Sequence, residues 1–130
     1  MLDTEVLFAL DPKDVHHTKA LKLLSSRFDM VAPDTSLLEF VTVLKAMRVR
    51  ALERQQLAVL LNQALDDRGV KQVKTIDALL FARQCELESR YGLTFYDSLI
   101  ASSALALDQK IVSDDRAFDL VPGLERIPLG

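Results

Sequence analysis

Five acidic residues stand out because each lies in a short segment beside apolar residues. They are Asp3, Glu39, Asp97, Asp114 and Asp115. Carboxylates gathered within about 10 Å of one another would repel by several kcal/mol at intermediate dielectric unless a positive charge offset them. Mg²⁺ or Mn²⁺ would supply that charge, because both ions prefer oxygen ligands and keep several of their own waters. These residue types therefore indicate a divalent-metal site, provided that the fold brings the segments together.

Each acid taken alone also has a local explanation. Ser36 and Glu39 fit the Ser-x-x-Glu pattern of a capping box, in which both side chains bond backbone N–H groups at a helix start. Thr94 and Asp97 make a similar pair, and Asp114 fits an N-cap for the turn that follows it. For a single acid, capping is the simpler interpretation. The metal hypothesis depends on the acids converging.

Helical and strand patterns alternate along the chain, and these elements must position the acids. The predicted helices cover residues 14–27, with Asp14 as N-cap, and 33–50, 51–68, 75–90 and 94–108. The predicted strands are residues 29–32, 70–74, 110–112 and 125–129, after a very short first strand that ends at Leu2. Gly69 and Gly92 follow two of the helices and are expected to end them.

Strands separated by helices predict an α/β fold, a three-layer sandwich with a central parallel sheet of about five strands. In such a sheet the carboxyl ends of the strands and the starts of the following helices meet at one edge. Asp3 and Asp115 follow predicted strands, while Glu39 and Asp97 lie near the starts of predicted helices. The topology therefore predicts that these acids share an edge.

Length and composition limit the other possibilities. The chain has 130 residues, 49% hydrophobic and 27% charged, so we expect one domain over residues 1–130. The net charge of −3 argues against a broad basic nucleic-acid-binding face. There is no run of about 18 apolar residues and no export signal in MLDTEVL, so we expect a cytoplasmic protein that does not enter a membrane. Cys85 has no partner cysteine and is expected to be a packing residue.

Four motifs carry a resemblance to a known family. In chain order they are LDTEVL, LLEFVTVL, LTFYDSLIASSALAL and IVSDDRAF. Together they resemble a PIN domain, and most closely the small VapC-type toxin ribonucleases. The resemblance implies a metal-binding, catalytic set of Asp3, Glu39, Asp97 and Asp115. It also places Asp114 at a variable position and gives Ser113 a hydrogen bond beside the metal or to the substrate.

The resemblance further implies a function and partners. The function is hydrolysis of RNA phosphodiester bonds with Mg²⁺ or Mn²⁺, with Asp3 and Asp97 as direct ligands and Glu39 and Asp115 binding directly or through water. The implied partners are an antitoxin protein and a second copy of the chain, held through helices near residues 37–65. The leucines Leu57, Leu60, Leu61 and Leu65 suit either that interface or the core. The alternative function is a PIN-fold module that binds RNA or protein without cleaving.

This chain departs from the family pattern at two places. Only Met1 and Leu2 precede the first aspartate, and Glu5 stands where Asn or Ser is common. Glu5 would add a metal ligand, alter the metal preference, or point away from the site. The sequence leaves these three interpretations open.

Other polar residues and other enzyme classes fit less well. His16 and His17 project about 100° apart on a helix and cannot chelate one ion together. Lys45, Arg48, Arg50 and Arg116 could all meet phosphates, but a solvated face is the simpler interpretation for the first three, whereas Arg116, beside the acids, suits either role equally. A phosphatase with an aspartate nucleophile would show Asp-x-Asp after the first strand, and a receiver domain would show paired acids there. This chain has Asp-Thr-Glu.

Overall fold

Short strands alternate with helices in the computed structural model, which describes residues 1–130. The helices are α1 (Thr4–Phe8), α2 (His17–Ser26), α3 (Asp34–Ala46), α4 (Ala51–Asp67), α5 (Ala78–Tyr91) and α6 (Phe95–Ala106). The strands are β1 (Val31–Pro33), β2 (Lys71–Val73), β3 (Lys110–Val112) and β4 (Glu125–Ile127), and a 3₁₀ helix η1 spans Arg116–Leu120. None of the helices is both long and apolar enough to cross a membrane.

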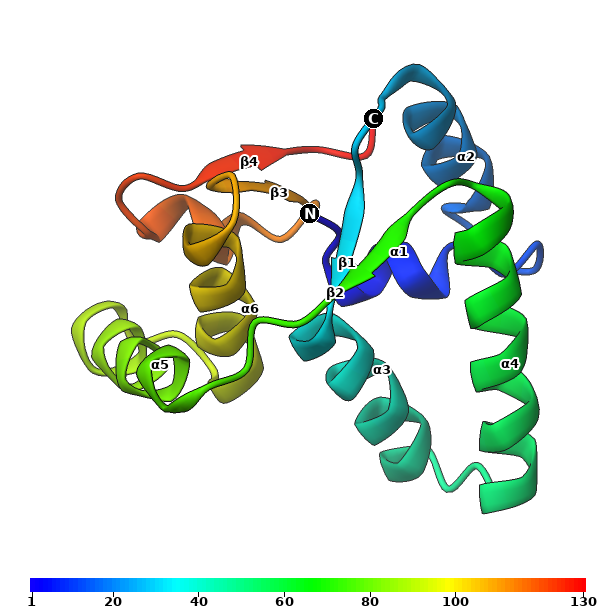
Figure 1. The fold of residues 1–130 in the computed structure, drawn as a ribbon, viewed down its shortest axis with the longest axis horizontal. Coiled ribbons are helices and arrows are strands. Elements are labelled where there is room, and N and C mark those ends of the chain that lie inside the picture. The colour runs from blue at the N-terminus through cyan, green and yellow to red at the C-terminus, as the bar shows by residue number, and fades with distance from the viewer.

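The strands form two parallel pairs that the amino terminus joins. β1 pairs with β2, and β3 pairs with β4. Between the pairs, the Leu2 N–H donates to the Val31 carbonyl at 2.9 Å and the Asp3 N–H donates to the Val112 carbonyl at 3.1 Å. Figure 1 shows the amino terminus between β1 and β3. The predicted parallel α/β fold is confirmed, but the first strand is reduced to one bridge between Leu2 and Val112.

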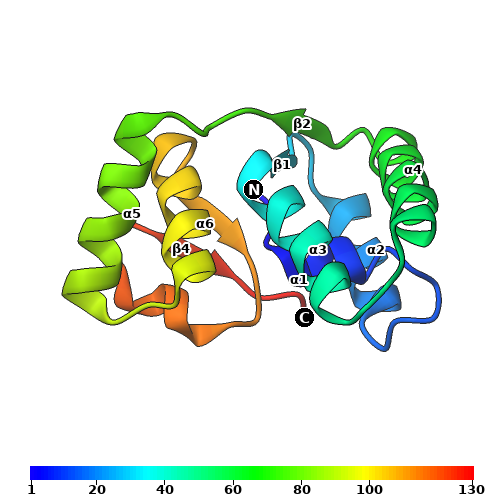
Figure 2. The same ribbon diagram turned by 90° about the horizontal axis from the view of Figure 1, so that it is seen from below.

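Side chains alternate across this sheet and face two separate apolar clusters. Leu2 and Val112 belong to a cluster of 16 buried residues, with α1 to α4, whereas Met1 and Ile111 belong to a cluster of 9 with α5, α6 and η1. Neighbouring residues of a strand point to opposite faces, so each face has its own core. Figure 2 shows α5 and α6 at one end of the molecule and α2 and α4 at the other. The arrangement is the expected three layers.

Several predicted boundaries are corrected. α2 begins at His17 and not behind Asp14, because the Asp14 carboxylate accepts the His16 N–H within the preceding turn. The helix predicted to reach residue 50 ends at Ala46, because Arg48 has a positive φ of 63° and leaves the helical path. The stops after α4 and α5 are confirmed, with Gly92 left-handed at φ 67°. α1 was not predicted.

Candidate active site

Asp3 lies at the centre of the site, where the first bridge ends and α1 begins. Its Oδ1 accepts the Thr4 N–H at 2.8 Å, which makes Asp3 the N-cap of α1. Its Oδ2 accepts the Ser113 hydroxyl at 2.7 Å, and both residues are buried. A short polar side chain can start a helix directly after an extended residue, which explains why α1 follows so closely. The buried carboxylate therefore has a defined partner for each oxygen.

Glu39 lies on α3, half-buried, and Ser36 fixes the start of that helix. The Ser36 hydroxyl donates to the Leu2 carbonyl at 2.8 Å, which ties α3 to the residue before Asp3. The N-cap of α3 is Pro33, so the capping box predicted for Ser36 and Glu39 is wrong. The Glu39 carboxylate is not consumed by capping.

Asp97 lies in the first turn of α6 and is half-buried. Thr94 is the N-cap, and its hydroxyl accepts the Asp97 N–H at 3.2 Å, so this half of the predicted capping pair is confirmed. The Thr42 hydroxyl on α3 donates to the Tyr96 hydroxyl at 3.0 Å, which holds the start of α6 against the helix that carries Glu39. The sequence did not predict this contact, although Thr42 and Tyr96 lie in the motifs that carry Glu39 and Asp97, because it joins residues 54 positions apart.

The loop after β3 carries the last two acids, and they have different roles. The Asp115 carboxylate accepts the Ala117 N–H at 2.9 Å and is the N-cap of η1. The Asp115 N–H donates to the Ser113 hydroxyl at 3.0 Å. Asp114 accepts the Leu129 N–H at 2.8 Å and anchors the carboxyl terminus, so the cap predicted for it is wrong. Of the two adjacent acids, Asp114 therefore anchors the carboxyl-terminal segment, and Asp115 caps η1.

Burial and mutual repulsion perturb these carboxyl groups. Burial raises the pKa of Asp3 to about 7, despite the hydrogen bonds from Ser113 and Thr4, and the charges of Glu5 and Glu39 add to the increase. Burial also raises the pKa of Glu39, with further repulsion from Asp97 and Asp115. The pKa of Asp97 is raised by burial and then by Asp115. Acidic residues from four segments of the chain therefore interact electrostatically.

The donor chemistry of these residues suits a hard divalent cation. All the donors are carboxylate oxygens, and partly buried carboxylates that repel one another favour a positive charge between them. No group of three or more His, Cys, Asp or Glu side chains is close enough to chelate an ion as the chain stands. Mg²⁺ keeps several waters and needs only one or two direct carboxylates, so this wider spacing still fits such an ion.

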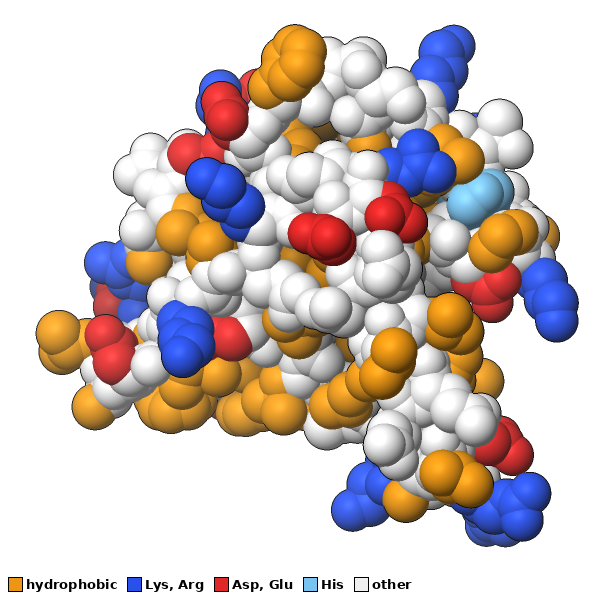
Figure 3. Space-filling model, turned by 45° about the vertical axis from the view of Figure 1, so that its right-hand side comes forward, with side chains coloured by type: hydrophobic (Ala, Val, Ile, Leu, Met, Phe, Trp, Pro, Cys, Tyr) orange, Lys and Arg blue, Asp and Glu red, His pale blue; other side chains and the backbone are white.

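None of the four predicted site acids is in an ion pair with a basic side chain, although the pKa of Arg126 is raised by its hydrogen bond to Asp119 and further by the charges of Asp114 and Asp115. Arg126 is paired with Asp119, with its Nε 2.9 Å from Oδ1, and it also donates to the Ser113 carbonyl at 3.2 Å. Arg116 is exposed. Exposed Lys45 lies in the last turn of α3, and exposed Arg48 and Arg50 lie between α3 and α4, where Figure 3 shows basic side chains at a protruding end.

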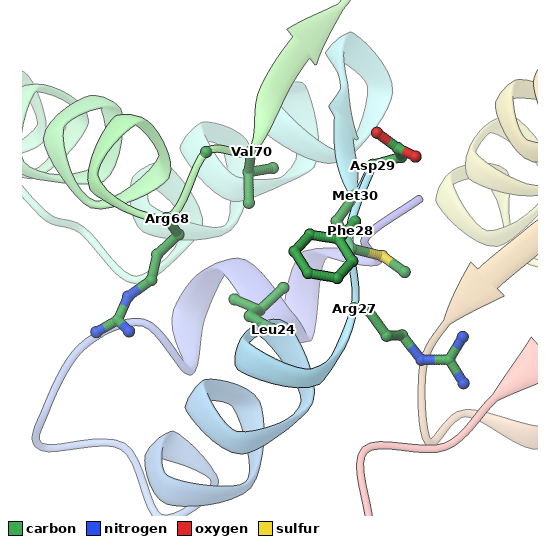
Figure 4. A pocket seen from close by; sticks show the side chains of 8 residues that line it. Leu24, Arg27, Phe28, Asp29, Met30, Arg68 and Val70 are labelled. Carbon is green, nitrogen blue, oxygen red and sulfur yellow. The ribbon is translucent and has the colours of Figure 1, made fainter.

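The remaining polar candidates and a surface hollow near the end of α2 lie outside the acidic set. His16 is exposed, and the His17 Nδ1 lies 2.8 Å from the Ala9 carbonyl oxygen. A hollow of about 250 Å³ lies between the end of α2 and the turn before β2. Figure 4 shows Leu24, Phe28 and Val70 around it, with arginines at its rim. None of the predicted site residues lines this hollow.

The chain resembles known proteins in its sequence and in its fold. The family model described as "PIN domain" matches residues 1–124. No curated protein sequence matches the chain. Three solved structures share the fold with a TM-score of 0.69 each. VapBC2 from Rickettsia felis, bound to a promoter DNA fragment, is 22% identical and aligns over 98% of this chain and 96% of its own.

The second similar structure is a toxin–antitoxin complex from Klebsiella pneumoniae, 16% identical, aligned over 99% of this chain and 96% of its own. The third is VapC20 from Mycobacterium tuberculosis, described as a toxin that cleaves the sarcin-ricin loop. It is 20% identical and aligns over 91% of each chain. At these identities the likeness establishes the fold.

Proposed function

The chain belongs to the PIN domain family, and from this premise we propose that it is a metal-dependent endoribonuclease. It hydrolyses phosphodiester bonds in RNA with an active site made of Asp3, Glu39, Asp97 and Asp115. The observation that supports this proposal best is the raised pKa of three partly buried carboxylates from separate segments, Asp3, Glu39 and Asp97, the last two of which are also repelled by the charge of exposed Asp115. Such an arrangement is costly to the fold and is typical of a functional site.

The four carboxylates would hold Mg²⁺ or Mn²⁺. When bound, such an ion makes a water more acidic and offsets the charge that develops on the phosphate. Asp3 is held from both oxygens by Thr4 and Ser113, so it provides a fixed ligand position. Asp115 is exposed and has one oxygen capping η1, so its other oxygen is available to take a proton from the attacking water.

We further propose that the enzyme is the toxin of a toxin–antitoxin pair, that residues 1–130 form one domain, and that the protein acts in the cytoplasm. Two of the similar structures are described as VapBC2 and as a toxin–antitoxin complex, which supports an antitoxin partner. A homodimer through α3 and α4 is supported by exposed apolar side chains there. Leu60 is 64% exposed, whereas Leu61 and Leu65 are buried in the core.

The test is RNA cleavage with Mn²⁺ or Mg²⁺, with and without a chelator. Asp97→Asn keeps the size of the side chain and removes its charge, so we expect the chelator-sensitive cleavage to fall by at least about a hundredfold. Asp66→Asn, on the exposed face of α4, is the matched control and should cleave as the unsubstituted chain does.

Two results would contradict the proposal. Metal-dependent cleavage that survives Asp97→Asn would reject this site. RNA binding without cleavage, under conditions where the metal binds, would favour the non-catalytic module instead.

A further inference from the structure

We propose that Glu5 is a positioning residue that ties the loop 113–115 to α1 and so sets the spacing between Asp3 and Asp115. The inference rests on the proposed function, because it concerns the same acidic site. It also selects among the three interpretations that the sequence left open for Glu5.

The contacts of Glu5 are to the loop. Its Oε1 accepts the backbone N–H of Asp114 in a short contact, and the Ser113 hydroxyl lies 3.0 Å from the same oxygen. Glu5 lies in the first turn of α1, two residues after Asp3. The carboxylate therefore spans from the helix that begins at Asp3 to the loop that carries Asp115.

Ser113 connects the two acids. Its hydroxyl lies 2.7 Å from Asp3 Oδ2, and it accepts the Asp115 N–H at 3.0 Å. A hydroxyl has one hydrogen, so at any moment Ser113 donates either to Asp3 or to Glu5. Only the Asp114 N–H gives Glu5 a bond that does not compete with Asp3. Asp3 therefore holds the Ser113 side chain at the start of α1, while Glu5 holds the loop backbone one residue further on.

The other anchors of the loop hold it to a different part of the molecule. Asp114 accepts the Leu129 N–H, and the Ser113 carbonyl accepts from Arg126. Both partners lie on or after β4. These bonds fix the loop to the edge of the sheet, but they do not fix its distance from α1. Glu5 supplies the bond from the loop backbone to the helix.

The position of Glu5 has an electrostatic cost. Its charge is one of those that raise the pKa of Asp3, so a second carboxylate here disfavours the ionised form of the first. Groups that orient metal ligands without touching the metal typically change metal affinity by about 10- to 100-fold when they are removed.

Two substitutions separate the reach of the side chain from its charge. Glu5→Gln keeps the length and the acceptor oxygen but removes the charge, whereas Glu5→Asp keeps the charge and is one methylene shorter. If Glu5 positions the loop, Gln preserves the bond to Asp114 and Asp loses it. If Glu5 is a metal ligand, Asp retains part of the affinity and Gln loses it.

The first measurement is hydrogen exchange of the Asp114 amide in the metal-free protein. We expect exchange to become at least about tenfold faster in Glu5→Asp and to remain near the starting rate in Glu5→Gln. Glu88→Gln, at an exposed position of α5, is the matched control. Unchanged exchange in both Glu5 variants would overturn the proposal. Since no metal is present, this result does not depend on the chain being a nuclease.

The second measurement is calorimetric titration with Mn²⁺. We expect Glu5→Asp to bind about 10- to 100-fold more weakly and Glu5→Gln to bind almost as the unsubstituted chain does. The reverse order would identify Glu5 as a ligand and overturn the positioning role. If the unsubstituted chain takes up no Mn²⁺, the proposed function fails, and the exchange measurement alone decides whether Glu5 holds the loop.

Discussion

At the residue scale, Asp3 is the carboxylate whose environment differs most from water. It is 7% exposed, and burial raises its pKa from 3.8 to about 7. A carboxyl group in such a position takes up either a proton or a cation near neutral pH, because burial penalises the bare charge. Protons and metal ions therefore compete for Asp3.

The raised pKa of Asp3 predicts how the stability of the metal-free protein depends on pH. The folded-state pKa of Asp3 lies above its unfolded value, so the stabilising contribution of the protonated group is complete below about pH 4 and is lost as the pH rises through about 7. We expect the free energy of unfolding to fall by about 2 to 3 kcal/mol between pH 5 and pH 8 from Asp3 alone. Urea denaturation at several pH values, in the presence of a chelator, measures this change in the free energy of unfolding.

Asp3→Asn isolates this contribution, since other groups also titrate. The pKa values of Glu39 and Asp97 are raised and act in the same direction, whereas burial lowers the pKa of the Met1 ammonium and acts in the opposite direction. The variant should lose less stability than the unsubstituted chain over the same pH range. Equal slopes in the two proteins would contradict the assignment.

At the element scale, the loop after β3 connects the site to the carboxyl terminus. Asp114 holds the Leu129 N–H, and Leu129 is buried in the larger cluster with α1 to α4. The residue beside the proposed catalytic Asp115 therefore fastens a terminal segment that has no strand or helix of its own. In this loop Asp114 anchors the segment around Leu129, whereas Asp115 belongs to the proposed active site.

Asp114→Ala should release that segment. The Leu129 N–H loses its acceptor, and we expect the free energy of unfolding to fall by about 1 kcal/mol. Faster hydrogen exchange at Leu129 would locate the effect. Asp114→Asn retains an acceptor oxygen and should keep most of the stability. A similar loss in both variants would point to the charge of Asp114 and not to its hydrogen bond.

At the scale of the whole molecule, the proposed site is assembled from both ends of the chain and its middle. Asp3 and Ser113, for example, are 110 residues apart in sequence and share a hydrogen bond. A metal ion held by such a set binds the folded state, because the unfolded chain does not bring the acids together. Ion binding and global stability are therefore linked.

Adding Mn²⁺ at pH 8 should raise the unfolding temperature. At a free concentration 100 times Kd, the stabilisation is about 2.7 kcal/mol. Thermal unfolding with Mn²⁺ and with a chelator measures the difference, and Asp97→Asn should lose most of it while Asp66→Asn keeps it. The same increase in both variants would mean that the ion binds elsewhere.

The sequence by itself determined the local elements and the segments that carry the acids. Gly92 as a helix stop and Thr94 as an N-cap were predictable because each acts on backbone groups only a few residues away. Alternation of helices and strands indicated a parallel sheet, and the geometry of parallel sheets indicated a shared edge for the acids. The motifs then indicated the PIN family, which the family model confirms.

Only the tertiary structure decided what individual side chains do at that edge. The sequence pattern suggested caps for Glu39 and Asp114, but the cap of α3 is Pro33 and Asp114 holds Leu129. It left Glu5 undecided, and the contact with Asp114 joins residues 109 apart. The physical reason is that caps and periodicity depend on neighbours along the chain. A hydrogen bond between distant segments depends on how the sheet and loops pack, and no local pattern encodes that arrangement.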